Sequence, residues 1–288
     1  MRVALGTVQF GMDYGVANTS GQVMAEQATA ILQAARHAGL DTLDTAIAYG
    51  NSESKLGELG VHGWKIISKL PPLPDAVENV EKWVVQQLQN SLQRLGAQHL
   101  DALLLHRPSD ILGQHGIAYA RALLQAKNEG LIHGIGYSIY SPDELAPLCT
   151  VLPPDIVQAP YNIIDRRLAT SGWMGRLADN GVRIHTRSVF LQGLLLMPAA
   201  ARPPWFDRWQ PLWQVWSDSC VQSGLSPLAV SLRYVLSQAD IERVVVGVDS
   251  VTQLHEIVTA VNGPAVSIFP QIESQDIELI EPSRWKLQ

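Results

Sequence analysis

Four side chains near the ends of apolar, strand-like runs have the types needed for proton transfer to a carbonyl group. Asp44 closes one run and Tyr49 follows it, while Lys69 lies near the end of "IISKL" and His106 ends "LDALLLH". A phenol ionises at about pH 10, which is too high for efficient acid–base catalysis at neutral pH. A nearby ammonium would lower that pKa, a carboxylate would keep the ammonium charged, and a neutral imidazole could donate a hydrogen bond to the carbonyl oxygen. Together these groups could protonate a carbonyl oxygen as hydride reaches its carbon, or remove that proton in reverse.

Each of these residues also has a structural interpretation. A histidine at a strand end is more often structural than catalytic, and an isolated buried aspartate usually caps a helix. Lys69 is harder to explain in this way, because "IISKL" would point its ammonium into the interior. A buried lysine is costly unless a carboxylate pairs with it, and we expect Asp44 on the adjacent strand to do so.

Apolar runs typical of strands alternate with helical patterns along the whole chain. We expect strands at 2–6, 40–45, 64–70, 100–106, 132–138, 155–160, 182–188 and 242–248. We expect helices at 26–39, 52–60, 76–96, 117–129, 207–223, 226–236 and 250–261, and another begun by 141–145. Eight such units predict a single-domain (β/α)8 TIM barrel over residues 1–288, whose strand C-termini would gather the four side chains. The alternative, an open doubly wound sheet, usually has fewer strands and a G-x-G-x-x-G motif after the first, which this chain lacks.

The bulk composition excludes several classes of protein. Hydrophobic residues make up 47% of the 288, so a large core can form and disorder is not expected. A net charge of −6 argues against nucleic acid or an anionic membrane as a partner, because both select for basic surfaces. We see neither a membrane-spanning run nor the apolar segment of a signal peptide. Cys149 and Cys220 fit neither a disulfide framework nor a zinc pattern, so we expect a cytoplasmic protein without a metal.

The stretch "DTAIAYGNSESKLG" resembles the signature of the aldo-keto reductase family, and "IISKL" and "DALLLHRP" match its lysine and histidine segments in order. The resemblance, closest to a bacterial short-looped branch, covers essentially the whole chain. It implies a (β/α)8 barrel and an Asp–Tyr–Lys–His tetrad at Asp44, Tyr49, Lys69 and His106. It further implies an oxidoreductase that interconverts a small-molecule aldehyde or ketone and an alcohol by hydride transfer with NADP(H) or NAD(H).

The same resemblance implies where the nicotinamide dinucleotide would bind. The residues it assigns to the cofactor are Gly6, Thr7, Ser138, Gln158, Arg187, Ser188, Phe190, Gly193, Gly247, Asp249, Ser250 and Gln253. Ser138 and Gln158 would hold the carboxamide, whereas Ser188, Phe190 and Gly193 would wrap the pyrophosphate.

Three positions depart from the family pattern. Ile139 replaces an asparagine that often contacts the carboxamide, and Arg187 replaces a tyrosine that stacks on the nicotinamide. Asp249 stands where relatives that prefer NADP(H) place a lysine or arginine for the 2′-phosphate. It would repel that phosphate and could accept a hydrogen bond from the ribose of NAD(H). Alternatively, Asp249 or Ser250 simply caps the last helix, so the choice of cofactor stays open.

Substrate contacts are expected from Tyr14 in the first loop and Trp205 in the loop after strand seven. Trp209, Trp213 and Trp216 have helical spacing and should pack on the barrel. A carbohydrate-type substrate is a weak preference. The alternatives are a cofactor-binding regulatory or sensor protein with little turnover and, less favoured, a metal-dependent barrel hydrolase. The sequence does not predict the oligomeric state.

Overall fold

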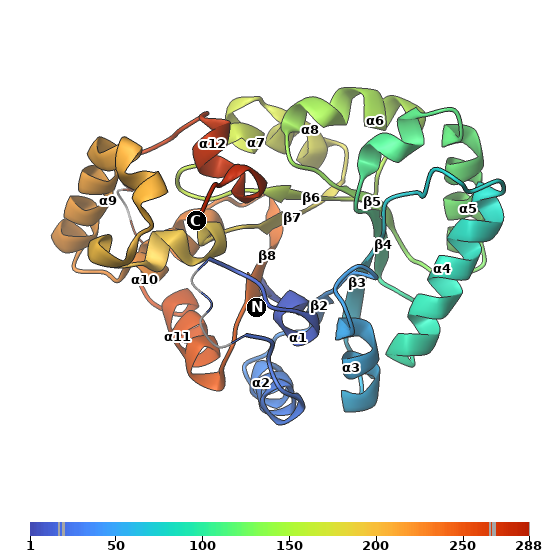
Figure 1. The fold of residues 1–288 in the computed structure, drawn as a ribbon, viewed down its shortest axis with the longest axis horizontal. Coiled ribbons are helices and arrows are strands. Elements are labelled where there is room, and N and C mark those ends of the chain that lie inside the picture. Colours follow the sequence, from blue (N-terminus) through green and yellow to red (C-terminus); the bar gives the residue numbers. More distant parts are fainter. Residues whose placement is uncertain (17, 19–20, 265, 267–268, 288) are drawn as a thin grey trace.

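Eight parallel strands close into a barrel, with the helices outside it (Figure 1). The computed structural model describes residues 1–16, 18, 21–264, 266 and 269–287. Each strand pairs with the next, and β1 pairs with β8 to complete the ring. This confirms the predicted (β/α)8 barrel. The strands are β1 Val3–Gly6, β2 Thr42–Asp44, β3 Lys65–Leu70, β4 Ala102–Leu105, β5 Ile135–Ser138, β6 Ile156–Pro160, β7 Arg183–Arg187 and β8 Ile241–Gly247.

The helices form the outer layer. They are α1 Val8–Gly11, α2 Ala25–His37, α3 Ser52–Leu59, α4 Val80–Leu95, α5 Gly116–Asn128, α6 Leu145–Val151, α7 Arg167–Thr170, α8 Trp173–Asp179, α9 Gln210–Ser223, α10 Pro227–Leu236, α11 Val251–Val261 and α12 Ile277–Ile280. Helix α4 shows why they form: Asn79 accepts a hydrogen bond from the Lys82 amide, and Gly96 ends the helix with φ of +61°. Between these caps an apolar stripe that includes Val84 and Leu88 packs inward.

Strand alternation divides the core into two regions. In β3, Ile66 and Leu70 point outward into the large cluster beneath the helices, whereas Ile67 belongs to a small separate cluster with Leu104 and Ile156. That small cluster fills the barrel interior. Because side chains alternate with a period of two, Lys69 points inward one layer above Ile67, at the C-terminal end of the barrel.

The structure departs from the predicted elements mainly between strands six and seven. We predicted no helix there, but α7 and α8 cover that crossover. Both are short, of 4 and 7 residues, so their helical period is hard to distinguish in the sequence. The predicted helix at 207–223 begins only at Gln210, because a 3-10 helix occupies Pro204–Trp209. Trp213 and Trp216 are buried in the core, as expected.

Candidate active site

Asp44 and Lys69 form a buried ion pair at the C-terminal ends of β2 and β3. The Lys69 ammonium lies 2.6 Å from Asp44 Oδ1 and also donates to the backbone carbonyl of Thr45 at 2.9 Å. Lys69 is fully buried. Gln158, from β6 across the barrel, donates its amide to Asp44 Oδ2 at 2.5 Å. Both carboxylate oxygens are therefore held, which fixes the ammonium in position.

Tyr49 lies in the turn after β2, held against α1 by a close backbone approach. A Cβ atom on Gly11 would lie 1.8 Å from the Tyr49 carbonyl oxygen, so only glycine fits at that position. The Lys69 ammonium lies 5.1 Å from the centroid of the Tyr49 ring. The His106 ring meets the Tyr49 ring edge-on, at 5.7 Å between centroids. All four residues of the predicted tetrad thus come together.

The electrostatics leave both Tyr49 and His106 neutral. Burial raises the pKa of Tyr49 above its ordinary value, and the opposing effect of Lys69 is smaller. The expectation that the ammonium would bring this pKa below its ordinary value is therefore wrong in net direction. Burial, helped by Lys69 and Arg187, lowers the pKa of His106 to about 4. The site presents a phenol O–H and an imidazole N–H, both of which can donate to a carbonyl oxygen.

Burial also disfavours the charge on Lys69, yet its pKa is raised. The attraction of Asp44 and Tyr49 outweighs the loss of solvent. Lys69 therefore stays an ammonium at neutral pH. A fixed positive charge beside the phenol can stabilise the phenolate that forms when Tyr49 gives up its proton.

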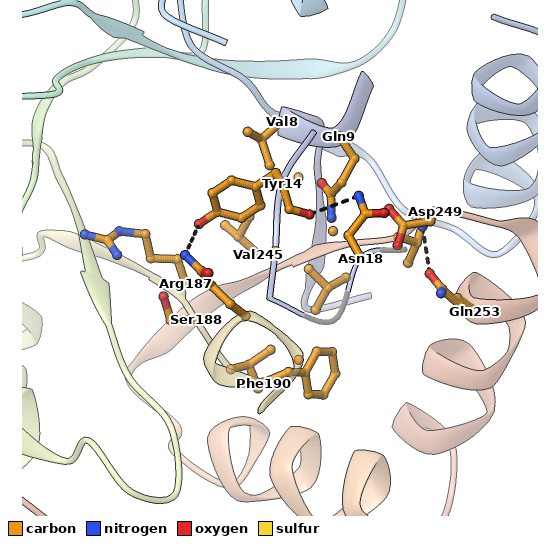
Figure 2. Close-up of a pocket in the computed structure, with 18 of the residues that line it drawn as sticks. Val8, Gln9, Tyr14, Asn18, Arg187, Ser188, Phe190, Val245, Asp249 and Gln253 are labelled. Atoms are coloured by element: carbon orange, nitrogen blue, oxygen red, sulfur yellow. Dashed lines mark hydrogen bonds between the residues drawn. The ribbon is translucent and has the colours of Figure 1, made fainter. Parts of the chain in front are cut away.

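A cavity of about 320 Å³ runs from Tyr49 across the barrel top to α11. Figure 2 shows part of its lining, with Arg187 near one end and Asp249 at the other. Every predicted cofactor residue lines it except Ser138 and Ser250. Ser138 lies directly beside Gln158 in the β5–β6 register, and Ser250 sits at the start of α11.

Three acceptor oxygens along this cavity have no hydrogen-bond partner within the described chain. They are Gln158 Oε1, Gln9 Oε1 and Asp249 Oδ1, and each is buried. Buried acceptors are rarely left unpaired, because each loses its bond to water on folding. A nicotinamide dinucleotide carries matching donors in its carboxamide and its ribose hydroxyls. The residues present therefore fit this cofactor, which supplies hydride when it is bound.

The start of α11 separates the two interpretations of Asp249. Ser250 is the N-cap, accepting from the Gln253 amide at 3.2 Å. The Gln253 side chain accepts from the Asp249 amide at 2.7 Å, as Figure 2 shows. The helix is thus capped by Ser250, and Asp249 Oδ1 has no hydrogen-bond partner in the described part of the chain. Burial raises the pKa of Asp249.

The loop after β7 lines the cavity in an unusual backbone conformation. Ser188, Leu191 and Gln192 have φ of 62°, 48° and 54°, a region in which residues other than glycine are strained. Asn162 supports the loop by donating to the Ser188 carbonyl at 3.1 Å. Phe190 and Gly193 also reach the cavity. Such strain is typical of functional loops.

Several cavity residues were not predicted. Gln9 lies in α1, two positions after Thr7, and Glu256 lies one helical turn beyond Gln253 in α11, so their spacing could have indicated both. Gln192 also lines the cavity and donates to the Tyr14 hydroxyl at 3.3 Å. Their polar side chains extend the set that could contact a dinucleotide.

The two predicted substrate residues have different surroundings. Tyr14 lines the cavity. Trp205 does not; its ring packs edge-on to Trp209, with the guanidinium of Arg208 5.0 Å and the ammonium of Lys286 5.9 Å from its centroid. A substrate contact from Trp205 stays a prediction.

The chain is similar to known proteins over most of its length. The sequence model of the Aldo/keto reductase family matches residues 2–268. The chain belongs to the aldo/keto reductase family. It is 26% identical to an NADH-specific methylglyoxal reductase of Escherichia coli (strain K12), over 91% of this chain and 90% of that protein. It is 28% identical to the L-glyceraldehyde 3-phosphate reductase of the same strain, over 64% of this chain and 59% of that one.

Solved structures show the same fold. An aldo-keto reductase from Bacillus halodurans, in its holo form, matches with a TM-score of 0.74 and 20% identity, covering 92% of this chain and 88% of that one. Family and relatives together make this aldo/keto reductase an NAD(P)H-dependent oxidoreductase of carbonyl compounds. Among the described residues, no cluster of three His, Cys, Asp or Glu side chains could hold a metal, which leaves the hydrolase alternative without a ligand set. None of the described helices is long and apolar enough to cross a bilayer.

Proposed function

We propose that this aldo/keto reductase uses NADH to reduce a small carbonyl compound, with Tyr49 as the acid. Tyr49 donates its hydroxyl proton to the carbonyl oxygen, and His106 donates a hydrogen bond to the same atom. Lys69 stabilises the phenolate left behind, and Asp44 keeps Lys69 in position. The mutual positions of these four side chains and their protonation states support this assignment.

The preference for NADH is supported chiefly by Asp249 Oδ1, a buried acceptor at the α11 end of the cavity with no hydrogen-bond partner among the described residues. Glu256, another acid, lines the same end of the cavity. Among the described residues that line the cavity, Arg187 is the only cation, and it lies beside Tyr49 at the other end. A 2′-phosphate would meet two negative charges there without a compensating positive one. A ribose 2′-hydroxyl could instead donate to Asp249 Oδ1.

Calorimetric titration of the purified protein with NADH and with NADPH tests this proposal. We expect NADH to bind at least roughly tenfold more tightly, a difference of about 1.4 kcal/mol. Asp249→Asn should reduce the difference in affinity between NADH and NADPH, because it removes the charge that repels the phosphate. Glu129→Gln removes an exposed carboxylate just after α5 and is the charge-matched control; it should leave that difference in affinity unchanged.

Two results would contradict the proposal. Tighter binding of NADPH would mean that other groups accommodate the phosphate and that Asp249 does not select the cofactor. Binding of neither dinucleotide would remove the basis for hydride transfer at this cavity.

A further inference from the structure

Arg187 is a cation beside the reaction centre without a carboxylate partner. It is the last residue of β7, lines the cavity next to Tyr49 and is half-buried. Its Nη2 donates to the Ile139 carbonyl at 2.9 Å, and it forms no ion pair with any residue that the structure describes. Its Nε and Nη1 have no hydrogen-bond acceptor in that same part of the protein. Two donors are therefore free to bind an anion.

The guanidinium is held in place by Tyr140, which makes this cation a preorganised group. It lies 4.5 Å from the centroid of the Tyr140 ring. The Tyr140 backbone is itself fixed, because its amide donates to Glu144 at 2.7 Å and its carbonyl accepts from Arg167 at 3.1 Å. A stacked guanidinium keeps its edge available for a bidentate contact with a carboxylate or phosphate.

The charges around the reaction centre do not balance. Lys69 and Asp44 cancel as an ion pair, and Tyr49 and His106 are neutral at pH 7, so Arg187 leaves a net charge of about +1. The charge of Arg187 acts on both neutral groups: it helps to lower the pKa of His106 and opposes the increase in the pKa of Tyr49 that burial causes. A bound anion would compensate this charge at the place where a substrate must lie.

Resting on the proposed function, we propose that the substrate is an anionic carbonyl compound whose carboxylate or phosphate pairs with Arg187. Its carbonyl oxygen would lie between Tyr49 and His106. Reduction leaves the anionic group unchanged, because hydride adds at the carbonyl carbon and the Tyr49 proton adds at the oxygen, giving the alcohol and the oxidised cofactor. The rival role for Arg187 is a contact with the cofactor alone, which would act on all substrates equally.

Matched substrate pairs at saturating NADH test this inference. Glyceraldehyde 3-phosphate is compared with glyceraldehyde, and succinic semialdehyde with butanal, so that one pair probes a phosphate and the other a carboxylate. We expect wild-type kcat/KM to favour the anionic member of at least one pair by roughly tenfold or more. The pair that shows the preference identifies the anion.

Variants then assign the preference to Arg187. Arg187→Gln should lower kcat/KM for the preferred anion by roughly 30-fold or more, mainly through KM, and should lower kcat/KM for its neutral partner by a clearly smaller factor. Arg187→Lys, which keeps the charge but loses the planar fork, should recover part of the loss. Arg121→Gln, at an exposed ion pair with Glu81, is the matched control and should change neither substrate.

The outcomes separate this inference from the proposed function. If wild-type protein reduces the neutral aldehydes but prefers neither anion, the anionic substrate is excluded and the proposed function stands. An equal fall for both members of a pair in Arg187→Gln would assign Arg187 to the cofactor instead. Failure to reduce any of the four compounds with NADH, despite NADH binding, would contradict both.

Discussion

Among single residues, Tyr49, the proposed acid, stays protonated because it is buried beside an ion pair whose charges already balance. Lys69 would attract a phenolate, but Lys69 is paired with Asp44, which also accepts a hydrogen bond from Gln158. Burial therefore outweighs the attraction of Lys69, and Tyr49 stays protonated. A protonated phenol suits the direction of reduction, in which the first need is a proton on the carbonyl oxygen. Removal of the proton, for alcohol oxidation, would need a higher pH.

The resting state of Tyr49 leads to a pH dependence that can be measured. Reduction should be level from about pH 6 to 9 and fall only above about pH 10, because the pKa of Tyr49 lies above its ordinary value. Alcohol oxidation should rise through the same range. The measurement is kcat against pH in both directions, with NADH binding followed as a check on folding. Loss of reduction below pH 9 would show that the phenol is already ionised there.

Replacing the Tyr49 phenol tests whether this side chain is the acid of the proposed reaction. Tyr49→Phe removes the proton donor but keeps the ring against Lys69 and His106. We expect turnover to fall by roughly 10²–10⁴-fold while NADH binding persists. Unchanged turnover would mean that Tyr49 is not the acid and that the proposed mechanism is wrong.

Among the structural elements, the strained loop after β7 lines the cavity where we propose that the cofactor binds. Gln192 has left-handed φ and ψ of 54° and 27°, and this conformation costs a side-chain-bearing residue about 1–2 kcal/mol. We therefore expect Gln192→Gly to be more stable than Gln192→Ala by about 1 kcal/mol, measured by urea unfolding. Both variants delete the same contact with Tyr14, so their difference isolates the backbone. An alanine variant as stable as the glycine variant would show that the loop is not strained.

The positions of the strands could be predicted from the sequence, whereas the hydrogen-bond partners of the site residues could not. Strand ends give the position of a side chain along the barrel axis, so Asp44, Lys69 and His106 could be placed from the order of apolar runs alone. The sequence could not show that Gln158 Oε1 and Asp249 Oδ1 lack a partner among the described residues, because that depends on which hydrogen bonds each side chain makes in the folded protein. Serine and aspartate are both favoured at helix N-caps, so only the hydrogen bonds in the structure show that Ser250 rather than Asp249 caps α11.

At the scale of the whole molecule, the end of the barrel opposite the cavity is closed by charged side chains. Arg183 at the start of β7 reaches across to Asp101, with 2.6 Å between Nη1 and Oδ2. Glu242 lies 3.3 Å from His185 Nε2 and 3.8 Å from Arg243 Nη1. In barrels of this kind, this face contributes stability while the other carries the chemistry. We therefore expect that a substitution at this face can change stability without changing activity.

Glu242 allows that separation to be tested through pH. Its pKa is lowered, first by the hydrogen bond from His185 and then by Arg183 and Arg243. A carboxylate with a lower pKa in the folded state stabilises the fold above its ordinary value of 4.5, and this contribution is lost as pH falls through the folded value. Glu242→Gln cannot take up that proton. Its free energy of unfolding should start lower at pH 7 and decline less steeply below pH 4.5 than that of wild type, while NADH affinity at pH 7 stays unchanged. If the free energy of unfolding, measured in urea, falls equally steeply with pH in both proteins, Glu242 does not contribute to the loss of stability in acid. Weaker NADH binding by the variant would show that the two ends of the barrel are coupled.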